Sequence, residues 1–269
     1  MSPPPVKRRP ARKRRTRGDD HLQTIDLNCD MGEGMPNDAL LMPFISSANI
    51  ACGYHAGNEK IMRQTITLAL QHHVAIGAHP GFADKENFGR TNMQLPANEV
   101  YDLITKQLNI LHQIAITEGA LLKHVKPHGA LYNMSAKDAA LANTIAAAVY
   151  DFDASLVLFG LSGSHSITEA VKKGLKTASE VFADRSYQDD GSLTPRTSPN
   201  AMLTSDEAAM QQVLQMTEKK TVTSTNGKTI PICAETICLH GDGTQAVSFA
   251  TKIREALNAN HIQVKSITH

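Results

Sequence analysis

Short apolar runs alternate with longer segments of helical periodicity along most of this chain. The apolar runs predict β-strands at residues 25–29, 48–52, 74–78, 121–125, 156–159, 179–182, 236–239 and 261–264. Because strands that alternate with helices are joined by right-handed crossovers, we expect these strands to be parallel.

The segments between the strands carry helix signals. Residues 97–118 place Val100, Ile104 and Leu111 on one stripe, and Gly119 is expected to end this helix. Further helices are predicted at 59–72, from a capping box of Ser135 and Asp138 to about 149, from a capping box of Thr204 and Glu207 to about 216, and from an N-cap at Thr244 to about 257. Asn226-Gly227, between two β-rich runs, predicts a hairpin outside this alternation.

Seven or eight strand–helix units predict an α/β fold, a seven- or eight-stranded β/α barrel. The length of 269 residues suits a single barrel domain over 24–269. A doubly wound open sheet is the alternative. Both architectures place functional residues at the C-terminal ends of the strands.

Charge is distributed unevenly. Residues 1–18 contain eight of the 27 basic residues and no acidic residue, so the other 19 basic residues face 26 acidic ones and leave the remainder with a net charge of −7. We therefore expect residues 1–23 to form a disordered basic tail. An acidic body argues against nucleic acid as a partner.

The apolar runs also exclude some locations. No run reaches eighteen residues, and the N-terminus lacks an apolar signal-peptide core, so neither a membrane span nor secretion is expected. The four cysteines form no CxxC pair, which favours a reduced, cytoplasmic setting. Cys29 and Cys52 are better explained as small buried side chains than as nucleophiles.

Polar side chains cluster at the first strand. Asp26, Asn28 and Asp30 alternate with apolar residues and therefore share one face, which would point into the lumen of a barrel. Asp30 and Glu33 could merely cap the next turn. Capping needs one carboxylate, however, and this segment supplies three carboxylates and an amide, so a functional role is favoured.

Four histidines, His55, His79, His128 and His240, each follow an apolar run. One such histidine is usually structural, but four at strand ends are hard to explain by packing. Imidazole suits both acid–base catalysis and metal ligation.

Three cations follow strands in the same way. Lys126 precedes Pro127 in a stiff extended segment, so its ammonium could be aimed at an oxyanion or phosphate rather than at solvent. Arg90 and Arg185 could bind a substrate carboxylate or form loop salt bridges.

Six motifs in order resemble the LamB/YcsF family. They are DLNCDMGE (26–33), ANIACGYHAG (48–57), GAHPGF with FGR (77–90), KPHGALYN (126–133), EVFADRSYQDDGSLTPR (180–196) and CLHGD (238–242). The resemblance covers about residue 24 to the C-terminus and implies a barrel related to the glycoside hydrolase/deacetylase superfamily. It also implies the activity of an ATP-dependent 5-oxoprolinase, which hydrolyses the lactam 5-oxo-L-proline to L-glutamate and splits ATP into ADP and phosphate. The chain would be the A subunit, working with B and C subunits.

This reaction assigns roles to the candidate residues. Asp30 or Glu33 would activate water with help from His55 or His79, and Lys126 and His128 would stabilise developing charge. The remaining candidates are assigned to substrate binding: Asn28, Asn49, Arg90, Arg185, His240 and Asp242. ATP is the co-substrate, and no metal ligand is assigned. No GxxxxGK[ST] motif is present, so ATP would bind at an unfamiliar site here or on a partner subunit.

Two other functions stay open at this point. A metal-dependent deacetylase acting on sugars or amides would use the aspartates and histidines to hold Zn²⁺. A non-catalytic subunit would only bind substrate or dock partners, with self-association also open.

Overall fold

The computed structural model describes residues 23–241, 243 and 245–268. The predicted basic tail at 1–23 lies outside these residues except for Gln23. Asp242 and Thr244, predicted as a substrate-binding residue and a helix cap, also lie outside them.

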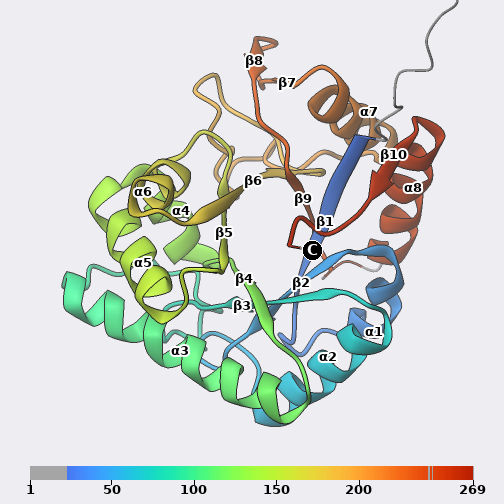
Figure 1. Cartoon of the computed structure of the whole chain (residues 1–269). Coiled ribbons are helices and arrows are strands. Elements are labelled where there is room, and N and C mark those ends of the chain that lie inside the picture. Colours follow the sequence, from blue (N-terminus) through green and yellow to red (C-terminus); the bar gives the residue numbers. More distant parts are fainter. Residues whose placement is uncertain (1–22, 242, 244, 269) are drawn as a thin grey trace, which may run out of the picture.

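Seven parallel strands form a closed barrel (Figure 1), as the alternation predicts. In order around the ring they are β1 (Gln23–Met31), β2 (Ser47–Ala51), β3 (Ala75–His79), β4 (Leu122–Val125), β5 (Val157–Leu161), β6 (Lys176–Phe182) and β9 (Thr236–Leu239). The ring closes because β1 pairs with both β2 and β9. The eighth predicted strand exists as β10 (Ile262–Val264), but it pairs only with the first residues of β1.

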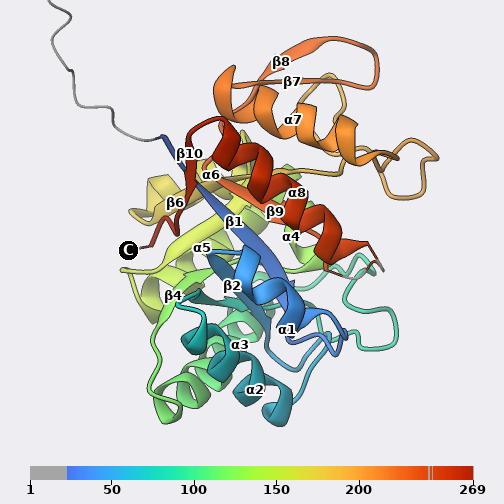
Figure 2. The same cartoon turned by 90° about the vertical axis from the view of Figure 1, so that its right-hand side faces the viewer.

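Helices surround the barrel (Figures 1 and 2). They are α1 (Asp38–Leu41), the 3-10 helix η1 (Met42–Phe44), α2 (Glu59–Gln71), α3 (Ala97–Thr117), α4 (Gly129–Lys137), α5 (Ala139–Phe152), α6 (His165–Lys173), α7 (Asp206–Glu218) and α8 (Ala246–Ala259). The predicted hairpin is confirmed as β7 (Thr221–Thr223) and β8 (Thr229–Pro231), which project beyond the barrel in Figure 2. Within the described residues, no helix combines the length and apolar character needed to span a bilayer.

Side chains of β1 alternate between two buried environments. Leu27, Cys29 and Met31 are fully buried in the apolar core between the strands and the helices. Asp26 and Asn28 are equally buried but form hydrogen bonds with polar residues of other strands. The predicted polar face of this strand is therefore confirmed, and it lies inside the barrel.

Two predicted helix starts are wrong. Ser135 lies inside α4, where its hydroxyl donates to the carbonyl of Tyr132, and Asp138 caps a separate helix by accepting from the amide of Ala140. Thr204 is not the N-cap of α7, because the side chain of Ser205 accepts from the amide of Ala208 instead. The side chains that accept from helix amides are those of Asp138 for α5 and Ser205 for α7.

This difference predicts the effect of capping substitutions. Ser205→Ala should lower the free energy of unfolding by about 1 kcal/mol because an amide at the start of α7 loses its acceptor. Thr204→Ala, one residue earlier, is the matched control and should change stability little. Chemical denaturation of both variants tests the capping role, and a larger loss in Thr204→Ala would contradict it.

Candidate active site

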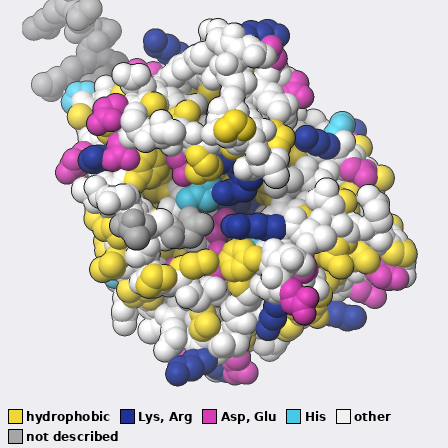
Figure 3. Space-filling view, turned by 180° about the vertical axis from the view of Figure 1, so that it is seen from behind, with side chains coloured by type: hydrophobic (Ala, Val, Ile, Leu, Met, Phe, Trp, Pro, Cys, Tyr) yellow, Lys and Arg dark blue, Asp and Glu magenta, His cyan; other side chains and the backbone are white. Residues whose placement is uncertain are grey.

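A cavity of about 750 Å³ opens at the C-terminal ends of the strands. Basic, acidic and histidine side chains gather around the hollow on this face (Figure 3). The charged and histidine residues that line it are Asp30, Glu33, His79, Arg90, Lys126, His128, Lys137, Asp138, Arg185, Arg196 and His240. Residues from distant parts of the sequence therefore converge on one rim, as a β/α barrel requires.

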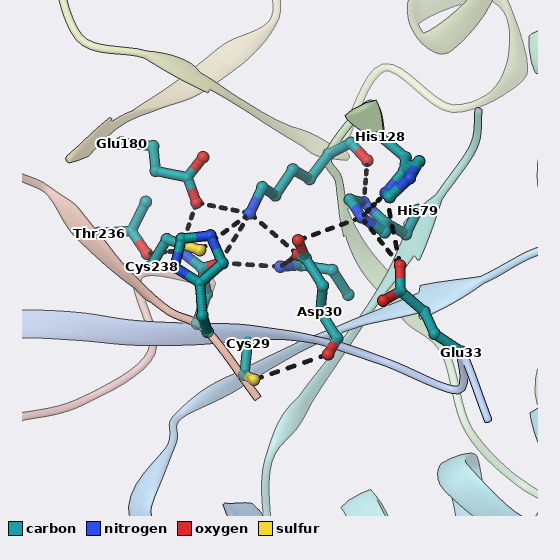
Figure 4. Close-up of polar contacts among 12 residues, drawn as sticks. Cys29, Asp30, Glu33, His79, His128, Glu180, Thr236 and Cys238 are labelled. Carbon is teal, nitrogen blue, oxygen red and sulfur yellow. Dashed lines mark hydrogen bonds and ion pairs between the residues drawn. The ribbon is translucent and has the colours of Figure 1, made fainter. Parts of the chain in front are cut away.

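Lys126 follows β4 and is almost fully buried between two carboxylates. Its Nζ lies 2.9 Å from Asp30 Oδ1 and 2.9 Å from Glu180 Oε2 (Figure 4). Burial alone would lower the pKa of Lys126, but the negative charge of Asp30 and Glu180 raises it well above its usual value. The residue is therefore a fixed cation at the floor of the cavity.

A buried amide network lies beneath this cation. Asn28 donates to Glu180 Oε2 at 2.8 Å and to Thr236 at 2.7 Å. Asn49 donates to Asn28 Oδ1 at 2.8 Å and to Asp30 Oδ1 at 2.9 Å. Both asparagines are fully buried and neither lines the cavity, so they hold the residues around Lys126 in place. Their predicted part in substrate binding stays a prediction.

The two carboxylates that face the cavity differ in proton affinity. Burial opposes ionisation of Asp30, but the charges of His79 and Lys126 lower its pKa well below the usual value. Burial, together with the negative charge of Asp30, raises the pKa of Glu33. Asp30 is thus a permanent anion, whereas Glu33 is the carboxylate suited to exchanging a proton.

Three imidazoles surround Glu33. The distances to Glu33 Oε1 are 3.0 Å from His55 Nε2, 3.4 Å from His128 Nδ1 and 3.8 Å from His79 Nε2. His79 Nε2 also lies 3.3 Å from Asp30 Oδ2. Burial would lower the pKa of His79, but Asp30 raises it above its usual value. Burial lowers the pKa of His55 and of His128 to about 3, so these two rings are neutral.

Packing fixes the neutral pair. The rings of His55 and His128 stack with centroids 3.7 Å apart. Gly89 packs against them at a φ of +65°, and a Cβ at this position would come within 2.8 Å of His55 and 2.9 Å of His128. Within this stack His55 is the ring that does not line the cavity, and it is buried.

Three arginines also line the cavity, and Arg90 lies over the ring of Phe88. Within 23–241, 243 and 245–268, no carboxylate forms an ion pair with Arg90, Arg185 or Arg196. Arg185 is held by the carbonyls of Thr194 and Ala201. The surplus positive charge suits an anionic ligand.

His240 links Arg196 to the half-buried Asp184. Its Nδ1 lies 2.8 Å from Asp184 Oδ1, and Arg196 donates to its Nε2 at 2.8 Å. Burial would raise the pKa of Asp184, but the hydrogen bond from His240 lowers it below the usual value. His240 is therefore held in one orientation on the cavity wall.

The structure brings together Asp30, Glu33, His79, Lys126 and His128 as the sequence predicts, while the roles assigned to them stay predictions. Glu180 is the main residue that sequence reasoning missed. It is the first residue of the motif at 180–196 but was given no role in the site, and its signal is a carboxylate within strand β6, where it is fully buried. Burial raises the thiol pKa of Cys29, and that of Cys52 to about 12, which supports the expectation that neither is a nucleophile.

One group of side chains has the composition of a metal site. Glu33, His55, His79 and His128 each offer a ligand atom, and these atoms all lie within 4.8 Å of one another. No metal ligand was predicted from the sequence.

Comparison with known sequences gives one family. A sequence profile of the LamB/YcsF family matches residues 25–269. The 5-oxoprolinase A subunit of Tolumonas auensis is 54% identical over 251 residues, which cover 91% of this chain and 100% of that protein. The protein of the same name from Shouchella clausii is 52% identical over 250 residues, covering 91% and 99%.

Solved structures agree with the fold. The lactam utilization protein of Thermus thermophilus superposes with a TM-score of 0.86 at 38% identity, over 91% of this chain and 100% of that one. The T48 deacetylase, solved with substrate, superposes with a TM-score of 0.50 at 12% identity, over 90% of this chain and 87% of that one. The second likeness concerns the fold alone and gives the deacetylase alternative no further support.

The charge arrangement at the cavity floor predicts a stability effect. Lys126→Met should lower the free energy of unfolding by about 3–5 kcal/mol, because Glu180 would be left buried without its cation. Adding Glu180→Gln should restore part of this loss. Lys172→Met, which removes an exposed partner of Glu169, is the control and should have little effect. Denaturant unfolding measures all three, and a Lys126→Met variant as stable as the control would contradict the pairing.

Proposed function

Because the chain belongs to the LamB/YcsF family, we propose that it is the A subunit of an ATP-dependent 5-oxoprolinase and that its cavity carries the hydrolysis of 5-oxo-L-proline to L-glutamate. The identity of 54% to a protein of that name, over that protein's whole length, supports the assignment. The observation that carries it is the cavity itself, where an ionised carboxylate, a proton-exchanging carboxylate and a fixed ammonium lie beside arginines that have no acidic partner among the described residues.

The chemistry of the substrate explains why such a site is needed. The lactam is a resonance-stabilised amide whose carbon resists water. Transfer of the terminal phosphoryl group of ATP to the lactam oxygen would give an imidate-like carbon that water attacks. Cleavage of the C–N bond, with a proton going to nitrogen, would leave an acyl phosphate. A second water would then release glutamate and phosphate.

The residues of the cavity fit the separate demands of this sequence of steps. Glu33, with its raised pKa, is the proposed general base for the attacking water. Asp30 and the protonated His79 form an ion pair beside Glu33. The negative charge of Asp30 raises the pKa of Glu33, and the positive charge of His79 lowers it. Lys126 stabilises negative charge that develops on oxygen.

The substrate and nucleotide carry anions that the arginines would bind. Arg90 or Arg185 is the proposed partner of the 5-oxoproline carboxylate, and His240, with Arg196, contributes to the same wall. A cavity of about 750 Å³ has room for more than one small ring acid, so it could also admit a phosphate group. We propose that B and C subunits complete the enzyme.

The direct test is an assay of glutamate release from 5-oxoproline, with and without ATP, by the chain alone and together with candidate B and C subunits. We expect ATP-dependent release by the complex. Asp30→Asn should reduce kcat by about 100-fold or more, because the anion that charges His79 and pairs with Lys126 is lost. The exposed Asp102→Asn is the matched control. A complex that releases no glutamate would overturn the assignment of the activity. An Asp30→Asn variant with normal turnover would overturn the role of Asp30.

The raised pKa of Glu33 predicts a pH dependence. A general base must be deprotonated, so activity should be lost as the pH falls through the pKa of Glu33, which lies above its ordinary value of 4.5. The acid limb of log(kcat/KM) against pH should therefore lie above 4.5, and Glu33→Gln should abolish turnover at every pH. An acid limb at or below the ordinary value would exclude Glu33 as the base.

A further inference from the structure

Two imidazoles at the cavity face one another through nitrogen atoms that require a shared cation. His79 Nδ1 lies 2.7 Å from the carbonyl of Lys126, and His128 Nε2 lies 2.8 Å from the carbonyl of Phe88. A backbone carbonyl only accepts hydrogen bonds, so both of these nitrogens carry hydrogen. The other two nitrogens, His79 Nε2 and His128 Nδ1, are 2.9 Å apart. In neutral rings they would direct lone pairs at each other, so either the proton of a charged His79, whose Nε2 also lies 3.3 Å from Asp30 Oδ2, or a metal ion that replaces this proton belongs between them.

A third donor converges on the same point. Glu33 Oε1 lies 3.4 Å from His128 Nδ1 and 3.8 Å from His79 Nε2. A shared proton would link only the two nitrogens, whereas one metal ion could be bound by both nitrogens and by the carboxylate oxygen. Two ligands about 2.1 Å from one ion are separated by about 3.0 Å at a right angle and by about 3.4 Å at a tetrahedral angle. The two shortest of the three donor separations match these values.

The groups behind these donors have the arrangement that supports metal ligands. Metal-binding histidines usually donate their second N–H to a carbonyl or carboxylate, as His79 and His128 do. Phe88 adopts a φ of 57°, an uncommon conformation for an aromatic residue, and its carbonyl accepts from His128. Glu33 is likewise held by His55 Nε2 at 3.0 Å.

His55 itself lacks this support. Its Nδ1 is buried and forms no hydrogen bond with the described residues, and His55 does not line the cavity. Its contact with Glu33 makes it a positioning residue rather than a ligand. Glu33, His79 and His128 all line the cavity, so further coordination positions would face any bound substrate.

We propose that Glu33, His79 and His128 bind one divalent transition-metal ion, for which Zn²⁺ is the best match to two imidazoles and a carboxylate. Zinc binding at this site does not depend on the proposed lactam hydrolysis. Because metal ligands are deprotonated, a bound ion would replace the proton of His79 and occupy the Glu33 carboxylate, so the metal-bound site would be an alternative to the metal-free arrangement in which Glu33 acts as a base. Within a catalytic site, such an ion would polarise water or a carbonyl oxygen.

The test uses the full chain without ATP, 5-oxoproline or partner subunits, so its result is independent of the proposed reaction. The protein is treated with chelator, dialysed and titrated with Zn²⁺ in a calorimeter. We expect one equivalent to bind, with affinity at least tenfold weaker in Glu33→Gln and in His128→Ala. Replacement of zinc by Co²⁺ should give visible absorption bands that both variants lose.

His72→Ala is the matched control, because His72 is an exposed histidine at the C-terminal end of α2 and is not one of the three donors. Zinc affinity should be unchanged in this variant. Circular dichroism shows whether each variant is folded. If His128→Ala does not fold, Glu33→Gln still tests the proposal, because glutamine has nearly the same shape as glutamate. Wild-type protein that is folded but binds no zinc at micromolar concentration would overturn the proposal, as would unchanged zinc affinity in folded Glu33→Gln.

Discussion

The ammonium group of Lys126 allows two carboxylates to remain inside the barrel. Glu180 is fully buried, and an isolated carboxylate in that position would be strongly disfavoured. Lys126 pairs with Glu180 on its buried side and with Asp30 on its cavity side. The hydrogen bonds of Asn28 and Asn49 then fix both acids, so the position of the cavity-facing carboxylate depends on a cation supplied by a strand on the far side of the ring.

This charge distribution determines the protonation of the surrounding groups. Asp30, kept ionised, makes His79 a cation and disfavours a second negative charge on Glu33. His55 and His128 stay neutral because they are buried and lie beside the charged His79. Groups of the same chemical type therefore differ in protonation within a few ångströms, which acid–base chemistry at one site requires.

The sequence was sufficient for the barrel and for the convergence of its polar strand ends, since parallel strands direct their C-terminal ends to one rim. It could show that Asp26, Asn28 and Asp30 share a face, but not how deep each lies. Depth depends on barrel radius and strand tilt, and it separates the buried Asn28 from the cavity-facing Asp30. Pairings between distant strands were also beyond the sequence. Nothing local marks Glu180 as the partner of Lys126, and the orientation of each imidazole is set by carbonyls elsewhere in the chain.

The closure of the barrel through β1 has a consequence for biosynthesis. β1 is made before every other strand of the ring, but one of its two neighbours, β9, is made after all the others. Until β9 is synthesised, Asp26 and Asn28 lack their hydrogen-bonding partner Thr236. The polar interior of a nascent chain therefore stays incomplete, and the hydrogen-bond network beneath the cavity can form only after the last strand of the ring has been synthesised.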